Sequence, residues 1–216
     1  MKKQSGFTLI ELAIVLVIIG LLLGGVLKGQ ELINSAKVKN MAGDFRNIQV
    51  EVYSYQDKFK ALPGDDKAAQ SHLGNTTTVE GNGNGVIEGT WDGTSGEAFV
   101  FWQHLRLAGL ATGSTTTTDS TYQPTNTEGG IIGVQSNPDK TIAGLSGSYA
   151  ICSDGILGKF AKQLDATLDD GNTATGSMKA ADTGSVDGVT AATAKISSGT
   201  TPTISDSTKY TVCMAF

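Results

Sequence analysis

The chain has 216 residues and a net charge of -5, enough for one domain or for one domain with an appendage. Only 17% of the residues are charged and 28 are glycine, about twice the usual share, which excludes a coiled coil along the whole chain. Residues 1–60 carry 8 basic and 5 acidic side chains, a charge of +3, and residues 61–216 carry 8 and 16, a charge of -8. Because this second part is acidic, no nucleic-acid binding is expected.

A long apolar segment follows a short basic N-terminus. Residues 7–27 contain only two polar side chains, Thr8 and Glu11, and an α-helix of this length spans about 31 Å, enough to cross the hydrocarbon core of a membrane. The segment continues into a helical pattern, whereas a secretory signal peptide ends at a small-residue cleavage site. Lys2 and Lys3 are expected to stay in the cytoplasm, which places the rest of the chain outside.

Glu11 is unusual in this segment because an ionised carboxylate inside a membrane costs several kcal/mol. Taken alone, it could lie at the interface and reach water, or it could have a function. The flanking residues favour a function.

Gly6-Phe7-Thr8-Leu9-Ile10-Glu11, with the apolar stretch behind it, resembles the N-terminal signal of type IV pilins and pseudopilins. The resemblance implies that a prepilin peptidase removes residues 1–6 by cutting between Gly6 and Phe7, and that the new amino group of Phe7 is methylated. It also implies that Glu11 pairs with the N-terminal amine of a neighbouring subunit during assembly. Such pairing offsets the cost of burying each charge and fixes the axial register of the subunits.

The sequence departs from this family at one position. Many members have a proline about twenty residues into the mature chain, where this chain has Lys28. Gly24 and Gly25 could weaken the helix there, since each glycine costs about 1 kcal/mol relative to alanine. Together with Gly20 and Gly29 they also have the spacing that allows close helix packing, so both interpretations stay open.

Residues 28–62 extend the helix with an amphipathic pattern. One apolar stripe recurs at alternating steps of four and three residues, and its members are Met41, Phe45, Ile48, Val52, Tyr55, Phe59 and Leu62. The stripe is short for a coiled coil, so we expect it to pack on a sheet of the same chain. Pro63-Gly64 ends the helix. The predicted long helix therefore spans residues 7–62, with the membrane and assembly segment at 7–27.

Residues 63–216 are predicted to form an extracytoplasmic head, and the fold class is α+β, with the long helix packed on a small antiparallel sheet. Strands are predicted at 130–134, 148–152 and 209–216 from their apolar patterns, and short helices at 97–110 and 156–170. Residues 112–128 are rich in threonine and are predicted to be an exposed loop that adds little to a core, and residues 171–208 to be irregular or short-stranded. His104 is expected at the surface or at the boundary of the core.

Cys152 and Cys213 are the two cysteines of the chain. A cysteine pair in an exported domain predicts one disulfide. The alternative is two unrelated thiols in a cytosolic protein. In pilins a disulfide-bounded loop near the C-terminus is a common surface feature, so the resemblance assigns that role to residues 152–213.

The Gly-Asn run at 82–85 resembles part of a calcium loop, with oxygen-bearing side chains at alternate positions. The pattern is incomplete, because Trp91 stands where a calcium loop has its last glutamate. A flexible turn is therefore the first interpretation and a calcium site the second. No other cofactor is expected. The residues that would serve as ligands are Asp65, Asp66, Glu80, Asn82, Asn84 and Glu88.

The resemblance implies a structural, non-enzymatic protein. The first hypothesis is a subunit of a type IV pilus, for adhesion, motility or DNA uptake, and the alternative is a pseudopilin of a type II secretion system. The expected partners are identical or related subunits, a prepilin peptidase and an inner-membrane assembly platform. The expected location is the bacterial inner membrane before assembly, and an extracellular filament or periplasmic pseudopilus afterwards. A membrane-anchored extracellular enzyme has the least support, because no catalytic motif was found in the sequence.

The acidic pair Asp169-Asp170 lies in a polar stretch and is interpreted as part of a solvated surface.

Overall fold

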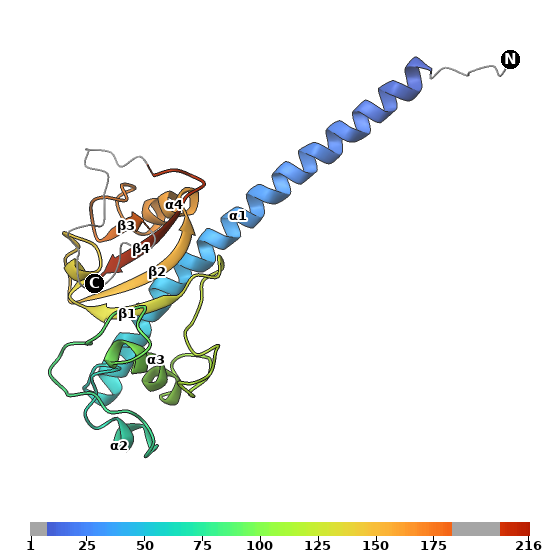
Figure 1. Ribbon diagram of the computed structural model, residues 1–216. Coiled ribbons are helices and arrows are strands. Elements are labelled where there is room, and N and C mark those ends of the chain that lie inside the picture. Colours follow the sequence, from blue (N-terminus) through green and yellow to red (C-terminus); the bar gives the residue numbers. More distant parts are fainter. Residues whose placement is uncertain (1–7, 183–203) are drawn as a thin grey trace. The chain divides into compact units, whose positions relative to one another are not determined.

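The computed structural model describes residues 8–182 and 204–216 (Figure 1). The predicted cleavage site at Gly6 and Phe7 lies outside the described residues. The chain divides into two compact units, Met1–Lys39 and Asn40–Phe216.

The first helix, α1, runs from Leu9 to Phe59 and is helical through Gly24 and Gly25. It contributes residues to both units. In the first unit, α1 exposes apolar side chains along its length. In the second unit, it turns the predicted apolar stripe inward: Met41, Phe45, Val52 and Tyr55 are at most 1% exposed. The predicted long apolar helix is confirmed.

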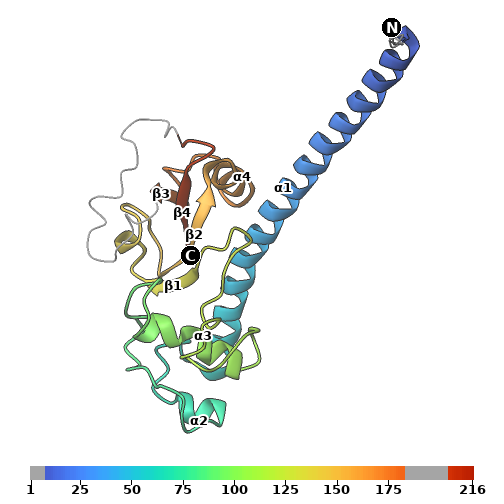
Figure 2. The same cartoon turned by 45° about the vertical axis from the view of Figure 1, so that its right-hand side comes forward.

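Within the described residues, the head contains one antiparallel sheet of four strands in the order β1-β2-β4-β3 (Figure 2). The strands are β1 (Ile132–Ser136), β2 (Tyr149–Leu157), β3 (Met178–Asp182) and β4 (Lys209–Ala215). The C-terminal strand β4 therefore lies inside the sheet, between β2 and β3. The predicted small antiparallel sheet is confirmed, with β3 found in a stretch whose structure the sequence left open.

Different parts of the chain pack on the two faces of the sheet. Phe45 of α1 lies beside Ile132 of β1 and Ile151 of β2. Because side chains alternate along a strand, Cys152 points to the opposite face. There it forms a disulfide with Cys213, its direct neighbour on β4, as predicted from the sequence. A compact apolar cluster surrounds this disulfide, formed by Trp91, Ile142, Leu145, Ala150, Ala181 and Ala215.

Four short helices complete the part of the head that the structure describes. They are α2 (Ala69–Leu73), α3 (Glu97–Leu107), the 3-10 helix η1 (Pro138–Lys140) and α4 (Gly158–Leu168). The sequence predicted α3 and α4 to within about three residues, which is usual because helix ends fray. Gly133 of β1 lies so close to the backbone of Trp91 that a Cβ atom there would collide with the Trp91 carbonyl.

Two expectations from the sequence were wrong, one about His104 and one about the loop at 112–128. His104 of α3 is fully buried: Nδ1 accepts a hydrogen bond from the Gly64 backbone at 2.9 Å, and Nε2 lies 2.7 Å from the Val79 carbonyl. The loop at 112–128 does contribute to the core, because Tyr122 is only 1% exposed. The buried Arg106 holds this loop by donating to the carbonyls of Thr112, Ser114 and Tyr122.

Candidate assembly surface

The N-terminal part of α1 carries a continuous apolar surface. Within the described residues, α1 is the one helix long and apolar enough to cross a membrane, and the apolar window that qualifies it has no buried residue. Its large side chains, among them Leu9, Leu16 and Leu21, are between 46% and 88% exposed from Leu9 to Leu27. A single soluble subunit rarely leaves so much apolar surface open to water, so lipid or another apolar surface must cover it.

Four glycines interrupt this apolar surface. A Cβ atom built on Gly20, Gly24, Gly25 or Gly29 would meet no heavy atom within 4 Å. The backbone of α1 is therefore accessible to an approaching partner along two small-xxx-small pairs, Gly20 with Gly24 and Gly25 with Gly29.

Glu11 and Thr8 form a reciprocal pair at the start of α1. The Thr8 backbone N–H donates to Glu11 Oε2 at 2.7 Å, and the Thr8 hydroxyl donates to the same oxygen at 2.8 Å. In return the Glu11 backbone N–H lies 3.4 Å from Thr8 Oγ1. This is a capping box, in which a Thr and a Glu three residues later satisfy backbone N–H groups that the helix leaves free.

This capping role was not among the predictions from the sequence, although Thr-x-x-Glu before an apolar run is the pattern that predicts it. Both hydrogen bonds from Thr8 end on Glu11 Oε2, and no donor among residues 8–182 and 204–216 bonds to Oε1. Glu11 can thus cap its own helix and keep an oxygen for a partner outside the subunit. Its pairing with a neighbouring amine stays a prediction.

The loop predicted to bind calcium is organised by hydrogen bonds. The buried Asp65 carboxylate accepts from the backbone N–H groups of Gly83, Asn84 and Gly85 at 2.6, 3.1 and 2.7 Å. Glu88 accepts from the side-chain amides of Asn82 and Asn84, and Glu80 from the backbone of Gln70. A calcium ion in this loop would compete with these N–H donors, and its presence stays an untested prediction.

Asp66, the remaining predicted ligand, is the centre of a separate network. Its buried carboxylate accepts from the Tyr55 hydroxyl at 2.8 Å and lies 2.7 Å from His72 Nδ1. Burial by itself raises the pKa of Asp66, but hydrogen bonds from His72, Ala68 and Tyr55 outweigh it and lower this pKa below the ordinary aspartate value. Asp66 thus joins α1 to the segment around α2.

Residues 1–27 match a family described as the prokaryotic N-terminal methylation motif. This match shows that the chain carries the N-terminal signal of type IV pilins and pseudopilins, as predicted from the sequence. No curated protein and no solved structure matches the chain. This signal and the apolar helix behind it fit anchoring in a membrane before assembly.

Proposed function

We propose that this chain is a structural subunit of a type IV pilus. In this proposal a prepilin peptidase cuts between Gly6 and Phe7, and the amino group of Phe7 is methylated. Residues 7–27 hold the subunit in the bacterial inner membrane and then, on the assembly platform, stack against the same segment of identical or related subunits. The resulting extracellular filament serves adhesion, motility or DNA uptake.

The observation that carries this proposal is the exposed apolar surface of α1 from Leu9 to Leu27, which lies within the residues that match the methylation motif. Lipid can cover this surface before assembly, and neighbouring copies can cover it in a filament. The open glycines support close helix contacts in the filament.

Glu11 supplies the polar contact in this otherwise apolar segment. Cleavage after Gly6 would create an ammonium group at Phe7, four residues before Glu11. In an apolar filament core, that ammonium group and a carboxylate of the next subunit would each be costly to bury alone. Their pairing sets the axial step between subunits.

A pseudopilin of a type II secretion system is the alternative, because the same signal occurs in both groups. The disulfide between Cys152 and Cys213 favours the pilus, since the resemblance associates a disulfide-bounded C-terminal region with pilins. No enzymatic role is proposed.

The proposal can be tested by intact-mass measurement on protein from sheared cell-surface filaments of the native host. We expect the mass of residues 7–216 with one added methyl group and without the two hydrogen atoms that the disulfide removes. Gly6→Leu should leave the leader attached and abolish filaments, while the neighbouring Ser5→Ala should behave as the wild type. Intact Met1 in surface filaments would contradict the cleavage, and a deletion strain that loses protein secretion but no surface filaments would support the pseudopilin.

A further inference from the structure

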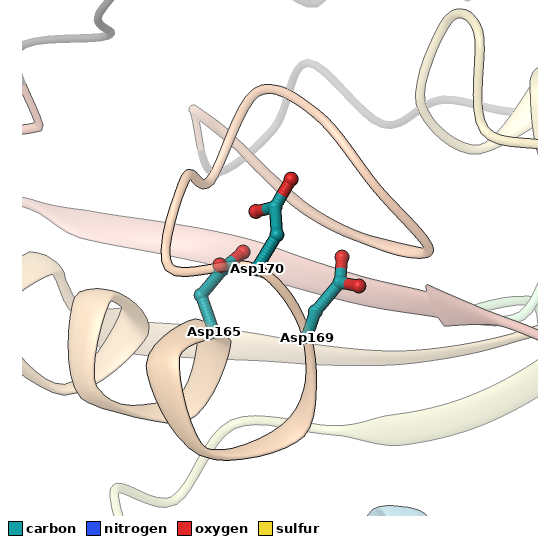
Figure 3. A group of neighbouring side chains, drawn as sticks. All are labelled: Asp165, Asp169 and Asp170. Atoms are coloured by element: carbon teal, nitrogen blue, oxygen red, sulfur yellow. The ribbon is translucent and has the colours of Figure 1, made fainter.

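Three carboxylates converge at the C-terminal end of α4. Asp165 lies in the last turn of the helix, and Asp169 and Asp170 directly follow its end at Leu168. Figure 3 shows the three side chains directed toward the same side of the chain. One oxygen from each carboxylate lies within 4.8 Å of the others, and no other group of three or more acidic, His or Cys side chains in the described residues converges in this way.

Asp165 is the exceptional member of this cluster. Its side chain is fully buried, and neither carboxylate oxygen makes a hydrogen bond of ordinary geometry. Burial raises its pKa to about 7, and the charges of Asp170 and Asp169 add to this effect, while the nearby backbone N–H of Gly171 lowers the pKa. Buried polar groups are normally paired, so an unpartnered carboxylate aimed at two others calls for a cation or a proton.

The other two carboxylates are held in place by the loop that leads to β3. Asp169 Oδ2 accepts from the Met178 backbone at 2.8 Å. Asp170 accepts from the Asn172 backbone at 2.8 Å and from the Thr175 hydroxyl at 2.7 Å. Gly176 has a φ of +74° and lies so close to Asp169 that a Cβ atom would collide with its carboxylate. The loop therefore wraps around the acidic side chains and orients them before any ligand arrives.

We propose that Asp165, Asp169 and Asp170 form a calcium site. Calcium binds carboxylate oxygens at about 2.3–2.6 Å, so two ligands of one ion lie at most about 5 Å apart, which agrees with the spacing here. The partial negative charge at the C-terminus of α4 adds to the attraction. Water molecules would supply the remaining ligands that calcium requires.

This site differs from the calcium loop that the sequence suggested. There, backbone N–H groups already donate hydrogen bonds to both oxygens of the Asp65 carboxylate. The Asp165 carboxylate at the end of α4 differs in this respect. Among the described residues, no cationic side chain contributes to the pKa shift of Asp165. A bound calcium ion would fasten the 169–178 loop to α4 and thereby position β3 at the edge of the sheet.

The test uses the full chain, purified in detergent and freed of metal with a chelator. Calorimetric titration with calcium chloride should show one site, and the thermal unfolding midpoint should rise with calcium. Asp165→Asn should abolish this rise, and Asp170→Asn should weaken binding at least about tenfold, since even the loss of a supporting group around a metal costs that much. Asp92→Asn, at an exposed acidic residue on a different loop, is the matched control and should bind as the wild type does.

The chelator-treated proteins provide the second readout. Without calcium, Asp165→Asn should be at least as stable as the wild type, because a buried amide costs less than a buried carboxylate without a partner. A wild type whose unfolding midpoint does not respond to calcium would overturn the proposal, and stabilisation by mild acid alone would show that the carboxylates share a proton instead. Binding that survives Asp165→Asn but is lost in Asp65→Asn would also overturn it and would place the ion in the 82–85 loop.

Discussion

At the residue scale, buried polar side chains with defined partners determine how the segments of the head meet. His104 joins α3 to two other segments through its two ring nitrogens. Because Nδ1 accepts from the Gly64 N–H, the ring proton must be on Nε2, where it is donated to the Val79 carbonyl. Burial lowers the pKa of His104, although the Val79 carbonyl, Asp66 and Glu80 act in the opposite direction. The folded protein thus favours the neutral imidazole.

A neutral, buried His104 predicts that its own contribution to the stability of the head falls in acid. Below the ordinary histidine pKa of about 6.5, the unfolded chain takes up a proton that the folded chain excludes. The contribution of His104 to the free energy of unfolding should therefore fall between pH 7 and pH 5, by at most about 1.4 kcal/mol per pH unit, while the raised pKa of Asp165 acts in the opposite direction. His104→Gln keeps an acceptor and a donor but does not titrate, so this variant should lose less stability, or gain more, than the wild type between pH 7 and pH 5. Denaturant titrations of both proteins at pH 7 and pH 5 measure the difference, and equal pH dependence would show that folding does not lower the pKa of His104.

The sequence could not reveal these residues, because their role depends on segments far apart in the chain. His104 lies on a helix with apolar neighbours, and nothing local shows that Gly64 and Val79 cover it. Asp165 likewise looks, in the sequence, like any polar residue of an amphipathic helix. Its convergence with Asp169 and Asp170 depends on how the loop after α4 folds back. By contrast, the Thr8–Glu11 capping box is local, and its spacing was present in the sequence.

At the element scale, periodicity predicted α1 well because one helix face repeats a simple pattern over many residues. Every member of the predicted stripe from Met41 to Leu62 is buried except Phe59, which is half-buried, and Ala42 is buried beside them. Strand ends were predicted less well, since β2 continues to Leu157 through an irregular register between Ser153 and Ile156. The 112–128 loop was misjudged because its threonines suggested an exposed segment, while its packing depends on Tyr122 and on Arg106 from α3.

The packing of α1 on the sheet gives a direct prediction at this scale. Phe45 is 1% exposed beside β1 and β2, so Phe45→Ala should lower the free energy of unfolding by about 3–5 kcal/mol. Val50 is 61% exposed on the same helix, and Val50→Ala is the matched control, with a change within about 0.5 kcal/mol. Denaturant titration of the full chain in detergent measures both. Equal effects of the two substitutions would mean that the stripe does not form the core.

At the scale of the whole molecule, the two compact units differ in whether they cover their own apolar surface. The unit Asn40–Phe216 buries its own apolar residues and is cross-linked by the disulfide between β2 and β4. The two cysteines are 61 residues apart in the sequence, and a disulfide that closes a loop of this length stabilises a fold by about 4 kcal/mol in the chain-entropy account. The unit Met1–Lys39 leaves its large apolar side chains from Leu9 to Leu27 exposed and needs a partner that the single subunit does not supply. This difference is what the proposed filament explains.

In the proposed filament, Glu11 is the polar contact that positions one subunit on the next. The structure gives Glu11 a second role, as the cap of its own helix, and two substitutions separate these roles. Glu11→Gln keeps an oxygen for the capping box but removes the charge. Thr8→Ala removes the hydroxyl of the capping box but keeps the charge, at a cost of about 1 kcal/mol in helix stability.

The deciding measurement is the number of surface filaments seen by electron microscopy in strains that carry each substitution, with processing and membrane level checked by immunoblot. Leaving the Phe7 ammonium unpaired in the filament core should cost roughly 3–5 kcal/mol per subunit. Glu11→Gln should therefore give normally processed, membrane-resident protein with few or no filaments, whereas Thr8→Ala should give filaments in near wild-type numbers. Wild-type filament numbers in Glu11→Gln, or an equal loss in both strains, would contradict the assembly mechanism proposed here.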